Sequence, residues 1–158
     1  TAHRQENVDS KAKFESMIRG LAEVHKRFGL PVIYCMHPRA KSRLQQFGLI
    51  MPPEVTCIEP VGFMEFLQLE ANARMTLTDS GGVQEESCIL KVPCITLREN
   101  TERPETIDMG CNTLAGTDAS KIVSSVEMML HKDIVWGTPF GVGISAQRII
   151  DILLKKTS

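Results

Sequence analysis

The stretch Thr76–Leu90 reads TLTDSGGVQEESCIL, and its order of residues sets the interpretation of the whole chain. It begins with a short apolar run, passes through Thr-Asp-Ser and two glycines, and ends in a segment of helical spacing with two adjacent glutamates. This order predicts a strand, a tight turn and a helix. A glycine costs a helix interior about 1 kcal/mol, so we expect a specific role for Gly81 and Gly82.

Short apolar runs alternate with helical patterns on both sides of this stretch. Strands are predicted from Pro31, from Val55, over Met75–Thr78, over Pro93–Leu97 and near Thr113. Helices are predicted over Asn7–Arg27, residues 40–47, Gly62–Asn72, Gly82–Leu90, a short stretch from Pro104, Ala119–His131 and Ala146–Lys155. Asp9 is a candidate cap of the first helix, and Gly29 is its expected end. This alternation indicates a parallel sheet covered on both faces, a doubly wound α/β domain.

Composition narrows the classes of function. With 158 residues and 42% hydrophobic content, the chain can bury one sizeable core, so residues 1–158 are predicted to form a single domain. A net charge of -1 gives no electrostatic reason to expect nucleic acid or a membrane surface as a partner. The sequence has neither a transmembrane-length apolar run nor a signal peptide, and its five cysteines contain no CxxC pair. We therefore expect a reduced, cytoplasmic protein.

The beginning of the chain is unusual for this alternation. The chain starts at Thr1 without a methionine, and the expected first strand has almost no residues before His3. We therefore expect that the natural chain extends upstream.

Polar clusters follow nearly every predicted strand. In open α/β sheets, ligands bind in the crevice outside the carboxyl ends of the strands. The segments at these ends are His3–Glu6, His37–Arg39, Val61–Gly62, Asp79–Gly82 and Arg98–Glu105. The sequence therefore predicts one binding site at this edge, and it suggests no metal site because no His/Cys/Asp spacing fits one.

The two glycines have a functional explanation at this edge. Ser80 or Asp79 can cap the helix, while Gly81 and Gly82 allow a ligand to approach the free backbone N–H groups. The helix dipole favours an anion there, so a phosphate or diphosphate is the expected ligand. Glu86, one to two turns further on, can accept hydrogen bonds from ribose hydroxyls. The alternative is that the glycines only permit a tight turn and that the glutamates lie on a solvated face.

Three motifs in order, TAHRQEN, TDSGGVQEE and RENTERPET, resemble the non-hydrolysing UDP-N-acetylglucosamine 2-epimerase family over almost the whole chain. The resemblance implies the C-terminal half of a glycosyltransferase-B type fold, in which two Rossmann-like domains hold a UDP-sugar between them. The N-terminal domain would then be missing from this chain. It also implies an isomerase that interconverts UDP-GlcNAc and UDP-ManNAc by eliminating and re-adding UDP without a cofactor. We expect the full-length protein to be a homodimer.

The resemblance also implies roles for individual residues. Ser80, Gly81 and Gly82 match the diphosphate-binding loop of the family, and Glu86 matches its ribose-binding glutamate. Phe66 falls where an aromatic residue lies beside the uracil. The matches with charged side chains are His3 and Arg4, as catalytic candidates, and Arg103, which would help to bind UDP. Together these groups would stabilise the negative charge that develops on the leaving diphosphate. Further candidates for the site are His37, Arg39 and Thr101.

Several alternatives stay open. The segment His37-Pro38-Arg39 departs from the one that forms a regulatory UDP-GlcNAc site in many bacterial relatives. Epimerases of other UDP-2-acetamido sugars share the motifs, and a UDP-sugar glycosyltransferase or a non-catalytic nucleotide-binding module are further alternatives. In the family, the carboxylates for proton transfer come from the N-terminal domain. The isolated chain is therefore expected to bind UDP weakly and to be inactive.

Overall fold

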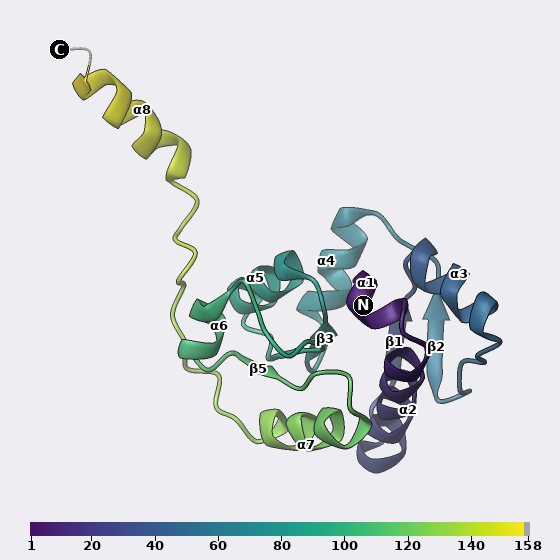
Figure 1. Ribbon diagram of the computed structural model, residues 1–158. Coiled ribbons are helices and arrows are strands. Elements are labelled where there is room, and N and C mark those ends of the chain that lie inside the picture. Colours follow the sequence, from purple (N-terminus) through teal and green to yellow (C-terminus); the bar gives the residue numbers. More distant parts are fainter. Residues whose placement is uncertain (157–158) are drawn as a thin grey trace.

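The structure, a computed structural model, describes residues 1–156 as parallel strands packed between helices (Figure 1). The strands are β1 (Val32–Cys35), β2 (Val55–Ile58), β3 (Thr76–Thr78), β4 (Cys94–Thr96) and β5 (Asn112–Leu114). The helices are α1 (Gln5–Val8), α2 (Lys11–Phe28), α3 (Pro38–Phe47), α4 (Phe63–Ala71), α5 (Gly81–Leu90), α6 (Pro104–Asp108), α7 (Ala119–Leu130) and α8 (Ser145–Lys156). The predicted α/β class with parallel strands is confirmed.

The strands form two parallel sheets. β1 pairs with β2 in the register Val32↔Val55, and the second sheet has the order β3-β4-β5 with Thr76 opposite Cys94. Within residues 1–156, no strand pairs with both β1 and β3, and no strand is assigned before His3. The predicted parallel arrangement is confirmed, and in this chain the strands form two sheets with Thr1 hydrogen-bonded to Leu77 and Cys35 between them.

The first predicted helix is divided in two. The prediction of one helix over Asn7–Arg27 with Asp9 as its cap was wrong. α1 ends at Val8, and α2 begins after Ser10, whose hydroxyl accepts a hydrogen bond from the backbone N–H of Lys13 at 3.5 Å. Asp9 instead forms ion pairs with two arginines of α3. The break has a local cause, because a serine hydroxyl that bonds to a nearby N–H favours a new helix start over a helix interior.

Helices cover both faces of the larger sheet. α5 and α7 lie on opposite faces of the β3-β4-β5 sheet, and α2 packs against α7 and also against β1 and β2 (Figure 1). Phe14 of α2, Ile95 of β4 and Ile122 of α7 are completely buried in the main core. A Cβ atom placed on Gly20 would lie 3.0 Å from Ile122 Cδ1, so glycine permits the close approach of α2 and α7. This close contact joins the helix that packs on β1 and β2 to the helix that packs on β4.

The C-terminal helix extends away from the rest of the protein. α8 follows an extended segment and points outward (Figure 1), and Ile149, Ile150 and Ile152 are exposed on it. Before this helix, the indole N–H of Trp136 donates to the carbonyl of Cys88 at 3.1 Å and holds the segment against α5. Across residues 1–156, no helix combines the length and apolar character needed to span a membrane.

Candidate functional site

Three of the segments that follow predicted strands meet at the start of α5, namely His3–Glu6, Asp79–Gly82 and Arg98–Glu105. Ser80 occupies the N-cap position in an extended conformation, and its carbonyl accepts from the N–H of Gln84. The N–H groups of Gly81, Gly82 and Val83 belong to the first turn, where the helix itself offers no acceptor. The Ser80 side chain makes no capping hydrogen bond within the described part of the chain, so the prediction that it caps the helix was wrong. These N–H groups are consequently directed at the edge where the motifs gather.

Neither packing nor backbone conformation requires the glycine pair. The φ angles of Gly81 and Gly82 lie outside the left-handed region, which other glycines such as Gly29 adopt. A Cβ atom on Gly82 would lie 3.8 Å from Ser80 Oγ, and a Cβ atom on Gly81 would lie 3.6 Å from a Glu102 oxygen. Both distances are ordinary van der Waals contacts. Glycine leaves the first-turn N–H groups open to a ligand, and the predicted ligand approach stays a prediction.

Asp79 fixes the N-terminal segment beside this helix start. Its side chain is completely buried. It accepts hydrogen bonds from the backbone N–H groups of His3 at 3.0 Å and Arg4 at 2.9 Å. It also accepts from Asn7 Nδ2 at 3.0 Å, and the same amide donates to the carbonyl of Leu97 at 2.9 Å. Asp79 was predicted as a cap of α5, and the structure shows instead that it anchors His3 and Arg4 at the site.

The imidazole of His3 lies between a carboxylate and a second imidazole. His3 Nδ1 is 3.6 Å from Asp79 Oδ1, and the His3 ring stacks on the His37 ring with 5.0 Å between the ring centroids. Burial lowers the pKa of His3, Asp79 raises it, and His37 and Arg4 lower it, with a net decrease from 6.5. The lowered pKa favours the neutral ring in the free protein. An anion bound beside it would raise this pKa and favour the imidazolium.

Arginine side chains surround the same edge. Arg4 Nη2 lies 3.3 Å from Glu102 Oε2, and its side chain is partly exposed. Arg98 is almost buried and binds two carboxylates, Glu6 at 2.5 Å and Glu102 at 3.0 Å. Its charge is already compensated by these partners, whereas Arg4 has one partner that is itself shared with Arg98. Arg4 is accordingly the more available cation for a ligand.

Arg103 lies directly at the glycine pair. A Cβ atom on Gly81 would be 3.7 Å from the central carbon of the Arg103 guanidinium, which also contacts Glu85. The loop before it is held by Thr101, whose hydroxyl donates to Gln84 at 2.5 Å and accepts from the N–H of Arg103 at 2.9 Å. Thr101 therefore positions the loop that carries Arg103, and its predicted ligand contact stays a prediction.

Glu86 lies on α5 beside another carboxyl group, Glu70 of α4. The pKa of Glu86 is raised: burial raises it most, a hydrogen bond with Glu70 lowers it, and the charge of Glu85 raises it further. Glu70 is only 3% exposed, and neither of its carboxylate oxygens has a hydrogen-bond partner among the described residues. Burial, and secondly the charge of Glu86, raise the pKa of Glu70 to about 7. The pKa values of both carboxyl groups are thus raised, and Glu70 favours its neutral form below pH 7.

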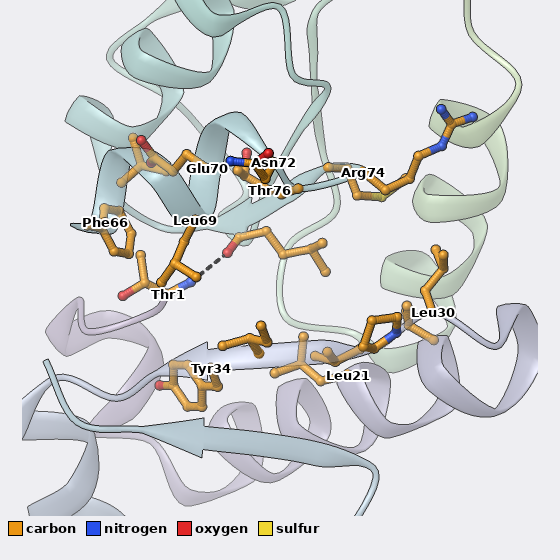
Figure 2. A pocket seen from close by; sticks show the side chains of 18 of the residues that line it. Thr1, Leu21, Leu30, Tyr34, Phe66, Leu69, Glu70, Asn72, Arg74 and Thr76 are labelled. Carbon is orange, nitrogen blue, oxygen red and sulfur yellow. Dashed lines mark hydrogen bonds between the residues drawn. The ribbon is translucent and has the colours of Figure 1, made fainter. Parts of the chain in front are cut away.

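The structure leaves three predicted residues outside this centre. Phe66 lines a cavity of about 600 Å³ between β1 and β3 (Figure 2). Arg39 is held by Asp9 at 2.6 Å, and its backbone N–H donates to His37 Nδ1 at 3.1 Å. The ring of His37 reaches the site only through its stacking on His3. The proposed neighbour of uracil, Phe66, and the ligand contacts of Arg39 and His37 stay predictions.

Sequence reasoning missed a set of buried polar residues that supports the site. Gln84 is fully buried and accepts from Asn112 Nδ2 at 3.2 Å, and Asn112 Oδ1 accepts from Thr96 Oγ1 at 2.9 Å. Asn7 belongs to the same class, because it connects Asp79 to the end of β4. The sequence carries no distinct signal for these residues, because only the folded environment shows which partners a buried amide has.

Comparison with known proteins gives consistent matches over the chain. The family described as UDP-N-acetylglucosamine 2-epimerase matches residues 1–154. The UDP-N-acetylglucosamine 2-epimerase of Methanocaldococcus jannaschii is 50% identical over 157 residues, which cover 97% of this chain and 43% of that protein. A Pseudomonas aeruginosa UDP-2,3-diacetamido-2,3-dideoxy-D-glucuronate 2-epimerase is 36% identical, with coverages of 98% and 43%.

A solved structure agrees with these relationships. The crystal structure of the Methanocaldococcus jannaschii UDP-GlcNAc 2-epimerase in complex with UDP-GlcNAc and UDP superposes with a TM-score of 0.91 at 49% identity. The match covers 98% of this chain and 44% of that chain. The present chain therefore spans less than half the length of the relatives that it matches.

Proposed function

The chain belongs to the UDP-N-acetylglucosamine 2-epimerase family, and from this premise we propose that it is the UDP-binding part of an enzyme that interconverts UDP-GlcNAc and UDP-ManNAc. The proposal assigns residues 1–158 to the C-terminal Rossmann-like domain, with an N-terminal domain completing the cleft. It is supported by the 50% identity to an archaeal enzyme of this name over 43% of its length. We further propose that the complete enzyme is a cytoplasmic homodimer.

One observation carries the proposal: cationic groups and uncapped N–H groups meet at a single helix start. Gly81 and Gly82 present first-turn N–H groups, and Arg103 lies beside them. His3 and Arg4 are tied to the same place by Asp79. A diphosphate needs several donors and positive charge within a few ångströms, and a helix N-terminus adds its own partial positive charge. UDP fits this set of groups.

The rest of the nucleotide extends along α5 in this proposal. Glu86 follows Gly81 by five positions, which corresponds to about 7.5 Å along a helix axis. Its carboxylate would accept hydrogen bonds from the ribose hydroxyls while the diphosphate occupies the helix start. Phe66 would approach the uracil from α4. The raised pKa of Glu70 supports this assignment, because a neutral Glu70 leaves the negative charge of the pair on Glu86.

The reaction follows from the same groups. A base removes the C2 proton of the sugar, the electrons of the C2–H bond form the C1–C2 double bond, and the C1–O electron pair leaves with UDP. UDP then adds back at C1 while a proton is delivered to the opposite face of C2, which inverts that carbon. Negative charge increases on the leaving diphosphate, where Gly81 and Gly82 N–H groups, Arg4 and Arg103 stabilise it. His3, neutral in the free site, would take up a proton as the anion binds. We place the base for the C2 proton in the N-terminal domain.

A second candidate substrate class has its own support. The chain is 36% identical to a Pseudomonas aeruginosa enzyme named for a UDP-2,3-diacetamido sugar. The groups discussed above all address the nucleotide, and the diphosphate and ribose are common to both substrate classes. The sugar is therefore decided by the rest of the cleft, and a comparison of both UDP-sugars with the complete enzyme distinguishes the two.

Calorimetric titration of the 158-residue chain with UDP tests the binding proposal. We expect weak binding that decreases at least about tenfold in Arg103→Ala, since a charge-assisted hydrogen bond contributes about 1.5–3 kcal/mol. Arg19→Ala is the matched control, because Arg19 is an exposed arginine on α2. Equal UDP affinity in the Arg103 variant and the control would remove the α5 start as the diphosphate site.

A separate experiment tests whether the base for the C2 proton lies outside these 158 residues. General acid–base catalysis contributes about 10²–10⁴-fold, and an isolated half of the cleft also admits water. We therefore expect no turnover when the chain is incubated with UDP-GlcNAc in deuterated water and the C2 proton is followed by NMR. Deuterium at C2, with accumulation of UDP-ManNAc, would show that these 158 residues contain the base.

A further inference from the structure

Threonine side chains hold both peptide groups of Arg103. The N–H of Arg103 donates to Thr101 Oγ1 at 2.9 Å, and its carbonyl accepts from Thr106 Oγ1 at 2.7 Å. The same carbonyl accepts from the backbone N–H of Thr106 at 3.0 Å. Thr106 is completely buried, and Thr101 is partly buried. The backbone of Arg103 is therefore fixed on both sides, although its guanidinium side chain is partly exposed.

Both threonines are connected to Gln84, which is completely buried on α5. The hydroxyl of Thr101 donates to Gln84 Oε1 at 2.5 Å. From Thr106 the connection passes through Asn112, whose Nδ2 donates to Thr106 Oγ1 at 2.9 Å and to Gln84 Oε1 at 3.2 Å. These residues and Arg103 form a closed ring of hydrogen bonds, which we call the Arg103 ring. Each threonine hydroxyl in it accepts one hydrogen bond and donates another.

Gln84 connects this ring to the start of α5. Its Nε2 donates to the carbonyl of Ser80 at 3.2 Å, and its backbone N–H donates to the same carbonyl at 3.3 Å. On the other side of the turn, a Cβ atom on Gly81 would lie 3.7 Å from the central carbon of the Arg103 guanidinium. One buried amide therefore sets the position of the Arg103 backbone relative to the first-turn N–H groups.

A closed ring of this kind is rigid only while every bond in it is made. Buried polar groups with all their partners specify one arrangement, whereas a missing partner leaves a buried donor or acceptor unsatisfied. An arginine side chain loses conformational entropy when a ligand immobilises it, and a backbone that is already fixed reduces this loss. The Arg103 ring thus favours anion binding before any ligand is present.

We propose that the Arg103 ring positions the cation of the anion site, and that Thr106 and Gln84 control diphosphate affinity through Arg103 without contacting the ligand. The inference rests on the proposed function, because it takes the start of α5 as the diphosphate site. Arg103 would touch the diphosphate itself. Thr106 and Gln84 are positioning residues, since they act only on where the guanidinium begins.

Thr106→Val in the complete enzyme tests the proposal, because valine keeps the shape of threonine and removes the hydroxyl that bonds to Arg103. We expect calorimetry to show about three- to tenfold weaker UDP binding. Thr106→Ser retains the hydroxyl and should bind UDP like the unchanged enzyme. The matched control is Thr96→Val, since Thr96 is also completely buried and donates to Asn112, but at Oδ1, outside the ring. The control should lose stability and retain its UDP affinity.

A double-mutant cycle shows whether the effect passes through Arg103. In the Arg103→Ala background, Thr106→Val should cause no further loss of UDP affinity. Because Thr106 is buried, Thr101→Val provides a second variant that opens the ring on its partly exposed side. It should weaken UDP binding in the unchanged background and have no effect in the Arg103→Ala background.

Three results would overturn this inference alone. Unchanged UDP affinity in Thr106→Val and Thr101→Val, with a loss in Arg103→Ala, would show that the ring does not position the arginine. An equal loss in Thr96→Val would assign the effect to the stability of the buried network. A full loss from Thr106→Val in the Arg103→Ala background would show that the effect bypasses Arg103.

One further result would contradict the proposed function as well. Unchanged UDP affinity in Arg103→Ala itself would remove the start of α5 as the diphosphate site, and the inference would fail with it.

Discussion

Asp79 and Glu70 are both buried carboxyl groups, but their surroundings differ in the hydrogen-bond donors that they offer. Asp79, at the end of β3, accepts hydrogen bonds from two backbone N–H groups and the Asn7 amide. Glu70, on α4, has no hydrogen-bond partner for either oxygen among the residues that the structure describes. The donors around Asp79 hold its neighbours in place, whereas burial without donors raises the pKa of Glu70. The first region is therefore fixed by hydrogen bonds, and Glu70 makes the second respond to pH.

The largest effect is expected from Asp79→Ala. The substitution leaves the N–H groups of His3 and Arg4 and the amide of Asn7 without their buried acceptor. We expect the free energy of unfolding to fall by about 3–5 kcal/mol, as for other broken buried charge networks. Urea denaturation measures it, with the exposed Glu15→Ala as the control. A loss below about 1 kcal/mol would mean that Asp79 does not organise its region.

Glu70 should make stability fall as pH rises. Its pKa is raised from the ordinary value of 4.5 to about 7, so between these values the native state binds more protons than the unfolded state. Stability is then highest below pH 4.5 as far as this group is concerned, decreases between pH 4.5 and 7, and levels off above. The decrease is about 3 kcal/mol at most, at 1.36 kcal/mol per pKa unit.

Glu70→Gln isolates this contribution. Denaturation curves between pH 5 and 8 should lose the downward slope in this variant, and Glu15→Gln should retain it. Persistence of the slope in Glu70→Gln would assign the pH dependence to another group and would remove the contrast with Asp79.

Glu86→Ala tests whether the neighbour of Glu70 carries a functional charge. Loss of hydrogen bonds from the ribose hydroxyls to a carboxylate should weaken UDP binding by about 1.5–3 kcal/mol in the complete enzyme. Calorimetry with UDP measures the loss, and Glu15→Ala again provides the exposed control. Unchanged UDP affinity would exclude Glu86 from the site and leave only a structural role for the carboxyl pair.

The smallest effect, with opposite signs for stability and binding, is expected from Gly82→Ala. Alanine should stabilise α5 by roughly 0.5–1 kcal/mol, because the added Cβ makes only ordinary contacts. The same methyl group should hinder a diphosphate at the first-turn N–H groups and reduce UDP affinity about tenfold. Thermal denaturation and calorimetry measure the two quantities. A variant that gains stability and also retains full affinity would argue against ligand approach as the reason for the glycine pair.

Much of the fold could be predicted from the sequence because its signals are local. Apolar runs and helical spacing placed β1 to β5 near their observed positions, and Gly29 ends α2 as expected, with a left-handed φ of 66°. The break at Ser10 was missed, since Asp9 and Ser10 are both good caps and only contacts with α3 show which one is used. The order in which the strands pair was not predicted, because strand pairing is a long-range property.

The site was predictable where its residues belong to short sequence motifs. The motifs identified His3, Arg4, the glycine pair and Arg103, and the structure brings these residues to one helix start. The supporting residues escaped prediction, because the partners of Asn7 or Gln84 lie far away in the chain. A single buried amide has no pattern of its own in a sequence, and only the folded environment reveals what it binds.

The hydrogen bonds of Asp79 also have a consequence for the order of folding. They connect residues that are 72 to 76 positions apart, and the Asn7–Leu97 bond spans 90 positions. Contacts between such distant residues close late, because the entropy of a long loop must be lost before they form. We expect residues 1–7 to dock onto an already formed β3–β4 pair and to detach first when the protein opens. The segment that carries His3 and Arg4 would then fold last and unfold first. Amide exchange in this segment would report the earliest step of unfolding.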